Sequence, residues 1–163
     1  AFVHRLAALL DDIHDRHGRN IVFLPMQLPA DAAVSRAVMG LMKNGASVLD
    51  GYLTAEEIMG VISLSDFVIA MRLHALIFSA RVCVPFIGIV YDPKVEAYVQ
   101  ALHMLSAENV SDFDEQTAME AVDTLISNRE HYAETLRRHS DELEAMAKQD
   151  AERLLELLER GKR

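Results

Sequence analysis

The chain has 163 residues, of which 51% are hydrophobic and 25% charged, as in a soluble globular protein with a full-sized core. Its formal net charge of -9 argues against a general nucleic-acid binder, which needs a basic face. The single cysteine, Cys83, excludes an internal disulfide and favours a cytoplasmic setting, and no apolar run reaches the roughly 20 residues that span a bilayer.

Helical and strand-like patterns alternate along the first two-thirds of the chain. Apolar residues over 2–13 follow a helical period that ends near Gly18, a residue suited to a C-cap. Further helices are expected after Asp31, after the Thr54–Glu57 capping box and after Asp92-Pro93. Between them lie four apolar runs that suit buried parallel strands: 21–24, 46–49, 67–71 and 86–91.

This alternation predicts right-handed βαβ units in a Rossmann-like, doubly wound parallel sheet. A doubly wound domain usually opens on a strand, whereas this chain opens on a helical pattern. We therefore expect the chain to be the carboxyl-terminal part of a longer protein.

The pattern changes after residue 105. A short edge strand is expected at Asn109-Val110, followed by a helix over 113–127 that is capped by Asp112 or Asp114. One long helix is predicted over 129–160, with alternating charges around a partial apolar face. That face carries Tyr132, Leu136, Leu143, Met146, Ala147, Leu154, Leu157 and Leu158.

We divide the chain into a Rossmann-like domain, residues 1–110, and a C-terminal helical extension packed on it, residues 111–163. A dimeric coiled coil through the long helix is the weaker alternative, because its heptad pattern is not sustained.

The strongest functional signal lies where the apolar run 67–71 turns directly into a helical pattern over 73–80, with Arg72 and His74 at the transition. Open α/β sheets bind ligands at the carboxyl ends of their strands, and helix N-termini offer N–H groups to anions. Arginine binds a carboxylate or phosphate through two parallel hydrogen bonds, and histidine changes its charge near neutral pH. The sequence predicts an anion site here; alternatively, Arg72 pairs with a structural carboxylate and His74 only caps its helix.

Tyr91 and Lys94 follow the fourth predicted strand at the same sheet edge and are further candidates for phosphate contacts. The alternatives are core packing for Tyr91 and a solvent-exposed first helical turn for Lys94. Asp92 is expected to cap its helix rather than act as a base. Gln27 and Asp31 follow the first strand and could line the same edge, although turn and cap duties explain them equally well.

No cofactor or metal motif is evident. His14 and His17 have a spacing that permits a shared metal, but a third ligand is missing from the pattern, so no metal site is predicted. Gly-x-Gly-x-x-Gly and Walker sequences are also absent, which leaves a dinucleotide or P-loop interpretation without support.

Arg72-Leu73-His74-Ala75 after an apolar strand, followed by the strand of 85–95 that ends in Tyr91-Asp92-Pro93-Lys94, resembles the polysaccharide pyruvyl transferase family. The similarity covers roughly residues 21–102. It implies a two-domain GT-B-like fold with this chain as the carboxyl-terminal half, no cofactor, and transfer of a pyruvyl group from phosphoenolpyruvate to a sugar of a cell-wall or surface polysaccharide precursor. It also implies that Arg72 and His74 bind the donor and take part in catalysis.

The resemblance implies three partners: phosphoenolpyruvate, a sugar or lipid-linked saccharide acceptor, and a missing amino-terminal α/β half. The isolated chain is expected to be inactive. Whether it forms a homo-oligomer is left open by the sequence. Two alternatives remain, the nucleotide-sugar-binding half of a GT-B glycosyltransferase and a non-catalytic module that dimerises through its last helix. Binding of a uridine nucleotide favours the first alternative, and a dimer that vanishes on truncation at Arg129 favours the second.

Overall fold

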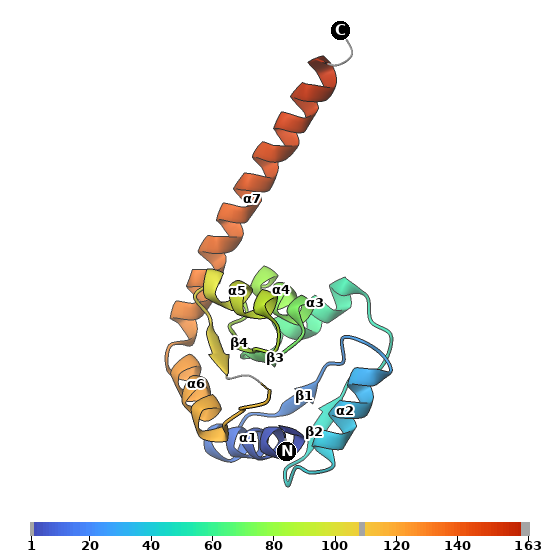
Figure 1. Ribbon diagram of the computed structural model, residues 1–163, viewed down its shortest axis with the longest axis vertical. Coiled ribbons are helices and arrows are strands. Elements are labelled where there is room, and N and C mark those ends of the chain that lie inside the picture. Colours follow the sequence, from blue (N-terminus) through green and yellow to red (C-terminus); the bar gives the residue numbers. More distant parts are fainter. Residues whose placement is uncertain (1, 108–109, 161–163) are drawn as a thin grey trace.

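The computed structural model describes residues 2–107 and 110–160, and this part of the chain forms seven helices and five short strands (Figure 1). The elements are α1 (Phe2–His17), β1 (Ile21–Phe23), α2 (Ala30–Met39), β2 (Ala46–Val48), α3 (Ala55–Ser63), β3 (Val68–Ala70), α4 (Leu73–Arg81), β4 (Phe86–Ile89), α5 (Pro93–Ala101), β5 (Leu105–Ala107), α6 (Glu115–Ser127) and α7 (Arg129–Arg160). The predicted α/β class is confirmed, and every observed strand pairing is parallel.

The strands form two sheets in the described residues, whereas the sequence pattern predicts one sheet of at least four strands. β1 pairs with β2, and β4 lies between β3 and β5. In the larger sheet Ala70 lies opposite Gly88, and Gly88 lies opposite Ser106. This register brings the carboxyl ends of β3, β4 and β5 to one edge.

Side chains, rather than a hydrogen-bonded ladder, join the two sheets. Arg19 precedes β1 and forms an ion pair of 3.2 Å with Asp66, which precedes β3. At the opposite end of the same strands, Asp31 and Arg72 form a second ion pair. Partly buried apolar residues of both segments pack against one core cluster, namely Ile21, Phe23, Phe67, Ile69 and Met71. Apolar side chains therefore fill the space between the two sheets, and an ion pair lies at each end of this junction.

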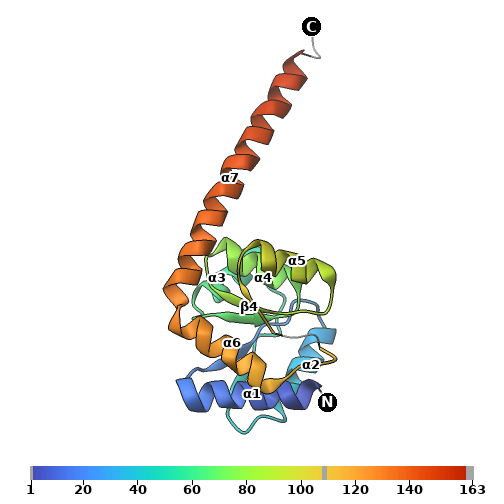
Figure 2. The same cartoon turned by 60° about the vertical axis from the view of Figure 1, so that its left-hand side comes forward.

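The central strand β4 is buried on both faces, which explains why its sequence is apolar without interruption. Successive strand residues point to opposite faces of a sheet. Phe86 packs in a cluster with residues of α4 and α5, whereas Ile87 and Ile89 pack in a cluster with residues of α1 and α6. All four residues of β4 are buried. Helices thus cover both faces of the larger sheet, with α3, α4 and α5 on one side and α1 and α6 on the other (Figure 2).

The helices beyond β5 take part in the fold to different degrees. Three residues of α6, Met119, Val122 and Leu125, are buried in the same cluster as residues of α1. The long helix α7 has the predicted bounds, and Leu136 in its first part is 1% exposed. The division of the chain at residue 110 stays a prediction.

The rest of α7 extends away from the other elements (Figure 1). Met146 is 62% exposed, whereas the side chains of Leu143, Ala147, Leu154, Leu157 and Leu158 lie outside the described residues. Over the described ranges, none of the helices combines the length and hydropathy of a membrane span.

Most of the predicted caps are confirmed. Gly18 has a φ of 64° and donates its N–H to the His14 carbonyl at 2.8 Å. Thr54 and Glu57 form a reciprocal capping box, and Asp114 caps α6. Asp92 caps α5 by accepting the N–H of Lys94 at 2.7 Å.

Two local predictions are wrong. Pro29 is the N-cap of α2, so Asp31 lies inside the first turn of that helix and its carboxylate is directed to other partners. The last strand is β5 rather than Asn109-Val110; Asn109 lies outside the described residues and Val110 is in a turn. The strand was missed because Leu105-Ser106-Ala107 is short and only partly apolar, and its pairing with β4 provides the stability that its own pattern does not indicate.

Candidate functional site

Arg72 lies in the turn between β3 and α4, as the sequence predicts. It is the N-cap residue of α4, with an extended backbone at φ -78° and ψ 121°. Its carbonyl accepts the N–H groups of Ala75 and Leu76 at 3.0 and 3.3 Å, which begins the helix. Its side chain makes no cap hydrogen bond. The guanidinium is therefore available for contacts across the sheet edge.

The guanidinium of Arg72 contacts the carboxylate of Asp31 through two hydrogen bonds. Nε donates to Oδ2 at 3.2 Å and Nη2 donates to Oδ1 at 2.6 Å. Oδ2 also accepts the main-chain N–H groups of Met26 at 3.3 Å and Gln27 at 2.9 Å. The loop after β1 thus holds the carboxylate, which in turn holds the arginine that follows β3.

Both ionised groups are stabilised by this contact. Burial opposes ionisation of Asp31, but the hydrogen bonds from Arg72 and from the Gln27 N–H outweigh it and lower the pKa of the carboxyl group below its ordinary value. The hydrogen bond to Asp31 raises the pKa of Arg72 above its ordinary value, with a smaller electrostatic contribution from Tyr91. The pair is therefore fully charged at neutral pH.

The contact with Asp31 leaves part of the guanidinium open. A guanidinium offers one bidentate edge at Nε and Nη2, here called side-on, and a second at Nη1 and Nη2, here called end-on. Asp31 takes the side-on edge, while Nη1 has no hydrogen-bond partner among the described residues. The Arg72 side chain is 42% exposed. A structural carboxylate and an external anion can therefore be bound by the same arginine on different edges.

His74 is the second residue of α4 and is exposed. Its ring centroid lies 6.5 Å from that of Phe78, one helical turn further on. In the part of the chain that the structure describes, the imidazole nitrogens of His74 have no hydrogen-bond partner. The structure therefore shows no capping hydrogen bond for His74, and its ring is accessible beside the N-terminus of α4.

Tyr91 and Lys94 lie just beyond the carboxyl end of β4. Tyr91 is 47% exposed, which does not fit core packing. Lys94 is exposed in the first turn of α5, and its ammonium has no ion-pair partner among the described residues. Among the described residues, no hydrogen bond, ion pair or ring contact joins Tyr91, His74 or Lys94 to Arg72; what the four share is a position beyond the carboxyl ends of β3 and β4.

The sequence leaves Asp31 open between the sheet edge and turn or cap duties, and it offers pairing with a structural carboxylate as the alternative for Arg72. The structure places Asp31 at the edge as that carboxylate, where it also accepts the N–H groups of the preceding loop. A usable signal was present, because an acidic residue in the connection after one strand and an arginine after another meet at the same edge of a parallel sheet.

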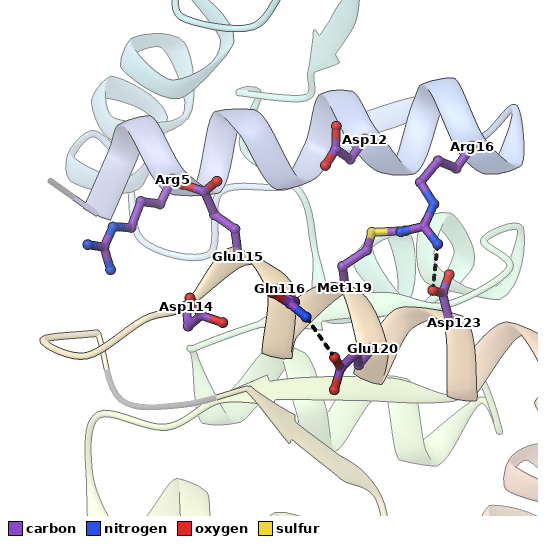
Figure 3. Close-up of a pocket in the computed structure, with 9 residues that line it drawn as sticks. All are labelled: Arg5, Asp12, Arg16, Asp114, Glu115, Gln116, Met119, Glu120 and Asp123. Atoms are coloured by element: carbon purple, nitrogen blue, oxygen red, sulfur yellow. Dashed lines mark hydrogen bonds and ion pairs between the residues drawn. The ribbon is translucent and has the colours of Figure 1, made fainter.

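A pocket of about 630 Å³ lies between α1 and α6 and contains none of the predicted site residues (Figure 3). Its lining includes Asp12, Asp114, Glu115, Glu120 and Asp123. Of its two arginines, Arg16 pairs with Asp123 at 2.8 Å and Arg5 donates to the Phe113 carbonyl. An acidic lining repels an anionic ligand, so this pocket is not the predicted anion site. Among the described residues, no group of three or more metal-ligating side chains is brought together.

Comparison with known proteins gives one match. The model of a family described as polysaccharide pyruvyl transferase matches residues 1–93, more than half of the chain. The matched residues include Arg72, His74 and Tyr91 and end one residue before Lys94. Searches of curated proteins and of solved structures returned no significant match.

Proposed function

Since the chain belongs to the polysaccharide pyruvyl transferase family, we propose that it carries the donor-binding edge of an enzyme that transfers the pyruvyl group of phosphoenolpyruvate to a sugar. The observation that supports this best is the Arg72 guanidinium, which lies within the matched residues and keeps its end-on edge open. Phosphoenolpyruvate is a small, multiply charged anion, and a bidentate cation beside a helix N-terminus suits its carboxylate or phosphate.

The proposed reaction joins C2 of the donor to two hydroxyl oxygens of the sugar, which gives a ketal. Two C–O bonds form at C2, the C2–O bond to phosphate breaks, and the double bond between C2 and C3 becomes single. One hydroxyl proton ends on C3, which becomes a methyl group, and the other ends on the departing phosphate. The atoms and electrons balance without an oxidant or reductant, so the residues of the chain bind, orient and move protons.

In this proposal His74 moves the proton to C3 or to the leaving phosphate. Its exposed ring beside the start of α4 is open to a ligand at the sheet edge. An imidazole can donate and accept a proton near neutral pH, which suits a general acid.

Tyr91 and Lys94 complete the proposed edge as contacts to the phosphate. The acceptor is proposed to be a sugar of a cell-wall or surface polysaccharide precursor, and the remaining part of the site to come from an amino-terminal α/β half in a GT-B-like arrangement. The single cysteine supports placing the reaction in the cytoplasm, where thiols stay reduced.

Titration calorimetry with phosphoenolpyruvate and with uridine diphosphate tests this proposal on the purified chain. We expect phosphoenolpyruvate to bind and uridine diphosphate to give no heat of binding. Binding of uridine diphosphate without binding of phosphoenolpyruvate would overturn the proposal and support the nucleotide-sugar half of a glycosyltransferase instead.

A further inference from the structure

Asp31 is held in place independently of Arg72. Its Oδ2 atom accepts the main-chain N–H groups of Met26 and Gln27, and its own N–H donates to the Gln27 carbonyl at 2.9 Å. Its side chain is 19% exposed, whereas that of Arg72 is 42% exposed. The carboxylate is thus the fixed member of the ion pair, and the longer arginine side chain is the member that it orders.

We propose that Asp31 is a positioning residue for the donor, an inference that rests on the proposed function. By occupying the side-on edge of Arg72, it fixes the plane of the guanidinium and aims the end-on edge at the carboxylate or phosphate of the incoming ligand. A free arginine side chain loses conformational freedom when it binds a ligand, and Asp31 imposes that order before the donor arrives.

The arrangement also affects which anions the edge selects. The charges of Asp31 and Arg72 offset each other, so the pair attracts a simple anion less than a lone arginine does. The two parallel N–H donors of the end-on edge are unchanged, and they match a planar or tetrahedral oxyanion. Selection at this edge therefore depends on bidentate hydrogen bonding rather than on net charge.

A different role for Asp31 predicts the opposite result. If the carboxylate only occupied Arg72 or repelled the donor, removing its charge would tighten donor binding. If it positions Arg72, removing its charge weakens binding even though the site becomes more positive. The sign of the change in affinity therefore distinguishes the two roles.

Calorimetric titration of phosphoenolpyruvate into the wild-type chain, Asp31→Asn and Asp66→Asn is the test. Asp66→Asn is the matched control, because it removes the same charge from the ion pair at the opposite end of the junction between the two sheets. We expect Asp31→Asn to weaken binding about threefold to tenfold, the cost of ordering one arginine on binding. Asp66→Asn is expected to bind like wild type.

Asp31→Glu and a spectroscopic readout keep the test decisive if Asp31→Asn folds poorly. Asp31→Glu keeps the charge but displaces the carboxylate, and it is also expected to weaken binding. In ¹⁵N-labelled protein without donor, the Nε–H resonance of Arg72, identified by its absence in Arg72→Lys, is expected to exchange slowly with water in wild type and Asp66→Asn and rapidly in Asp31→Asn.

The outcomes separate this inference from the proposed function. Equal or tighter binding of phosphoenolpyruvate by Asp31→Asn, or a slowly exchanging Arg72 resonance in that variant, overturns the positioning role and leaves the proposed function standing. Failure of the wild-type chain to bind phosphoenolpyruvate, pyruvate or inorganic phosphate overturns both.

Discussion

Arg72 and Asp31, 41 residues apart in the chain, meet side-on, with Nη2 2.6 Å from Oδ1 and Nε 3.2 Å from Oδ2. The contact links the connection after β1 to the connection after β3, two strands that share no ladder in the described residues. It also leaves the end-on edge of Arg72 directed away from Asp31. This ion pair thus links the two sheets and leaves the end-on edge of Arg72 open for the proposed contact with the donor.

The contribution of this pair to stability is expected to disappear in acid. The pKa of Asp31 is lowered in the folded state, so the pair stabilises the fold above the ordinary aspartate pKa of about 3.9 and loses this effect as the pH falls through the folded value. Because Arg72 is substantially exposed, the full effect is about 1 kcal/mol or less.

Urea unfolding of wild type and Asp31→Asn between pH 7 and pH 3 checks this expectation. The difference in unfolding free energy between the two proteins is predicted to stay constant down to about pH 5 and to shrink below about pH 4. A difference that grows on acidification would show that the ion pair is not its source.

Asp11 is a second carboxylate that accepts main-chain hydrogen bonds, and we expect its contribution to stability to be larger than that of the Asp31–Arg72 pair. It is 5% exposed and accepts the N–H groups of Lys43 and Asn44 at distances between 2.8 and 3.0 Å. Asp11→Ala leaves these donors without their charged acceptor, and we expect a loss of about 2–3 kcal/mol. The neighbouring Asp12 is exposed, so Asp12→Ala is the control and is expected to change stability by less than about 0.5 kcal/mol. Equal melting temperatures for the two variants would contradict this account of Asp11.

Gly88 lets α5 approach β4 closely. A Cβ atom at this position would lie 2.5 Å from Cγ2 of Val99, a buried β-branched side chain with little freedom to turn away. Gly88→Ala is therefore expected to destabilise the fold by about 1–3 kcal/mol, measured by thermal melting. Adding Val99→Ala removes the obstructing methyl groups, so the cost of Gly88→Ala is expected to be smaller in that background. An unchanged cost would mean that α5 is not what excludes the side chain.

The two parts of α7 differ in what they contribute to the fold. Ala133 and Leu136 are buried, whereas the helix beyond residue 140 extends away from the other elements (Figure 2). A chain ending at Ser140 is expected to melt within a few degrees of the full chain. A chain ending at Asn128 is expected to lose several kcal/mol of stability, because a buried leucine is missing.

Truncation at Arg129 consequently cannot by itself test dimerisation, because it also removes core side chains. A chain of 1–140 that fails to fold would refute this division of α7.

The sequence predicted the elements that depend mainly on a local pattern of residues. Because β4 is buried on both faces, it is an unbroken apolar run. The Thr54–Glu57 capping box indicates the start of α3 independently of the residues that pack against that helix. The positions of Arg72 and His74 follow from the same logic, since a strand that turns into a helix places them at its end. By contrast, β5 depends on its pairing with β4, and the side-on contact of Asp31 with Arg72 depends on how two distant connections meet. The residues next to each do not show it, although an acidic residue and an arginine that follow two parallel strands are expected at one sheet edge.

The central claim, that the open edge of Arg72 binds the donor, is tested most directly by titrating phosphoenolpyruvate into wild type and Arg72→Lys. Lysine keeps the positive charge but cannot reproduce either bidentate edge. A charged hydrogen bond contributes about 1.5–3 kcal/mol, so we predict that affinity falls about tenfold or more. Equal affinity of the two proteins for phosphoenolpyruvate, with both folded by thermal melting, would show that Arg72 only pairs with Asp31 and would contradict the account.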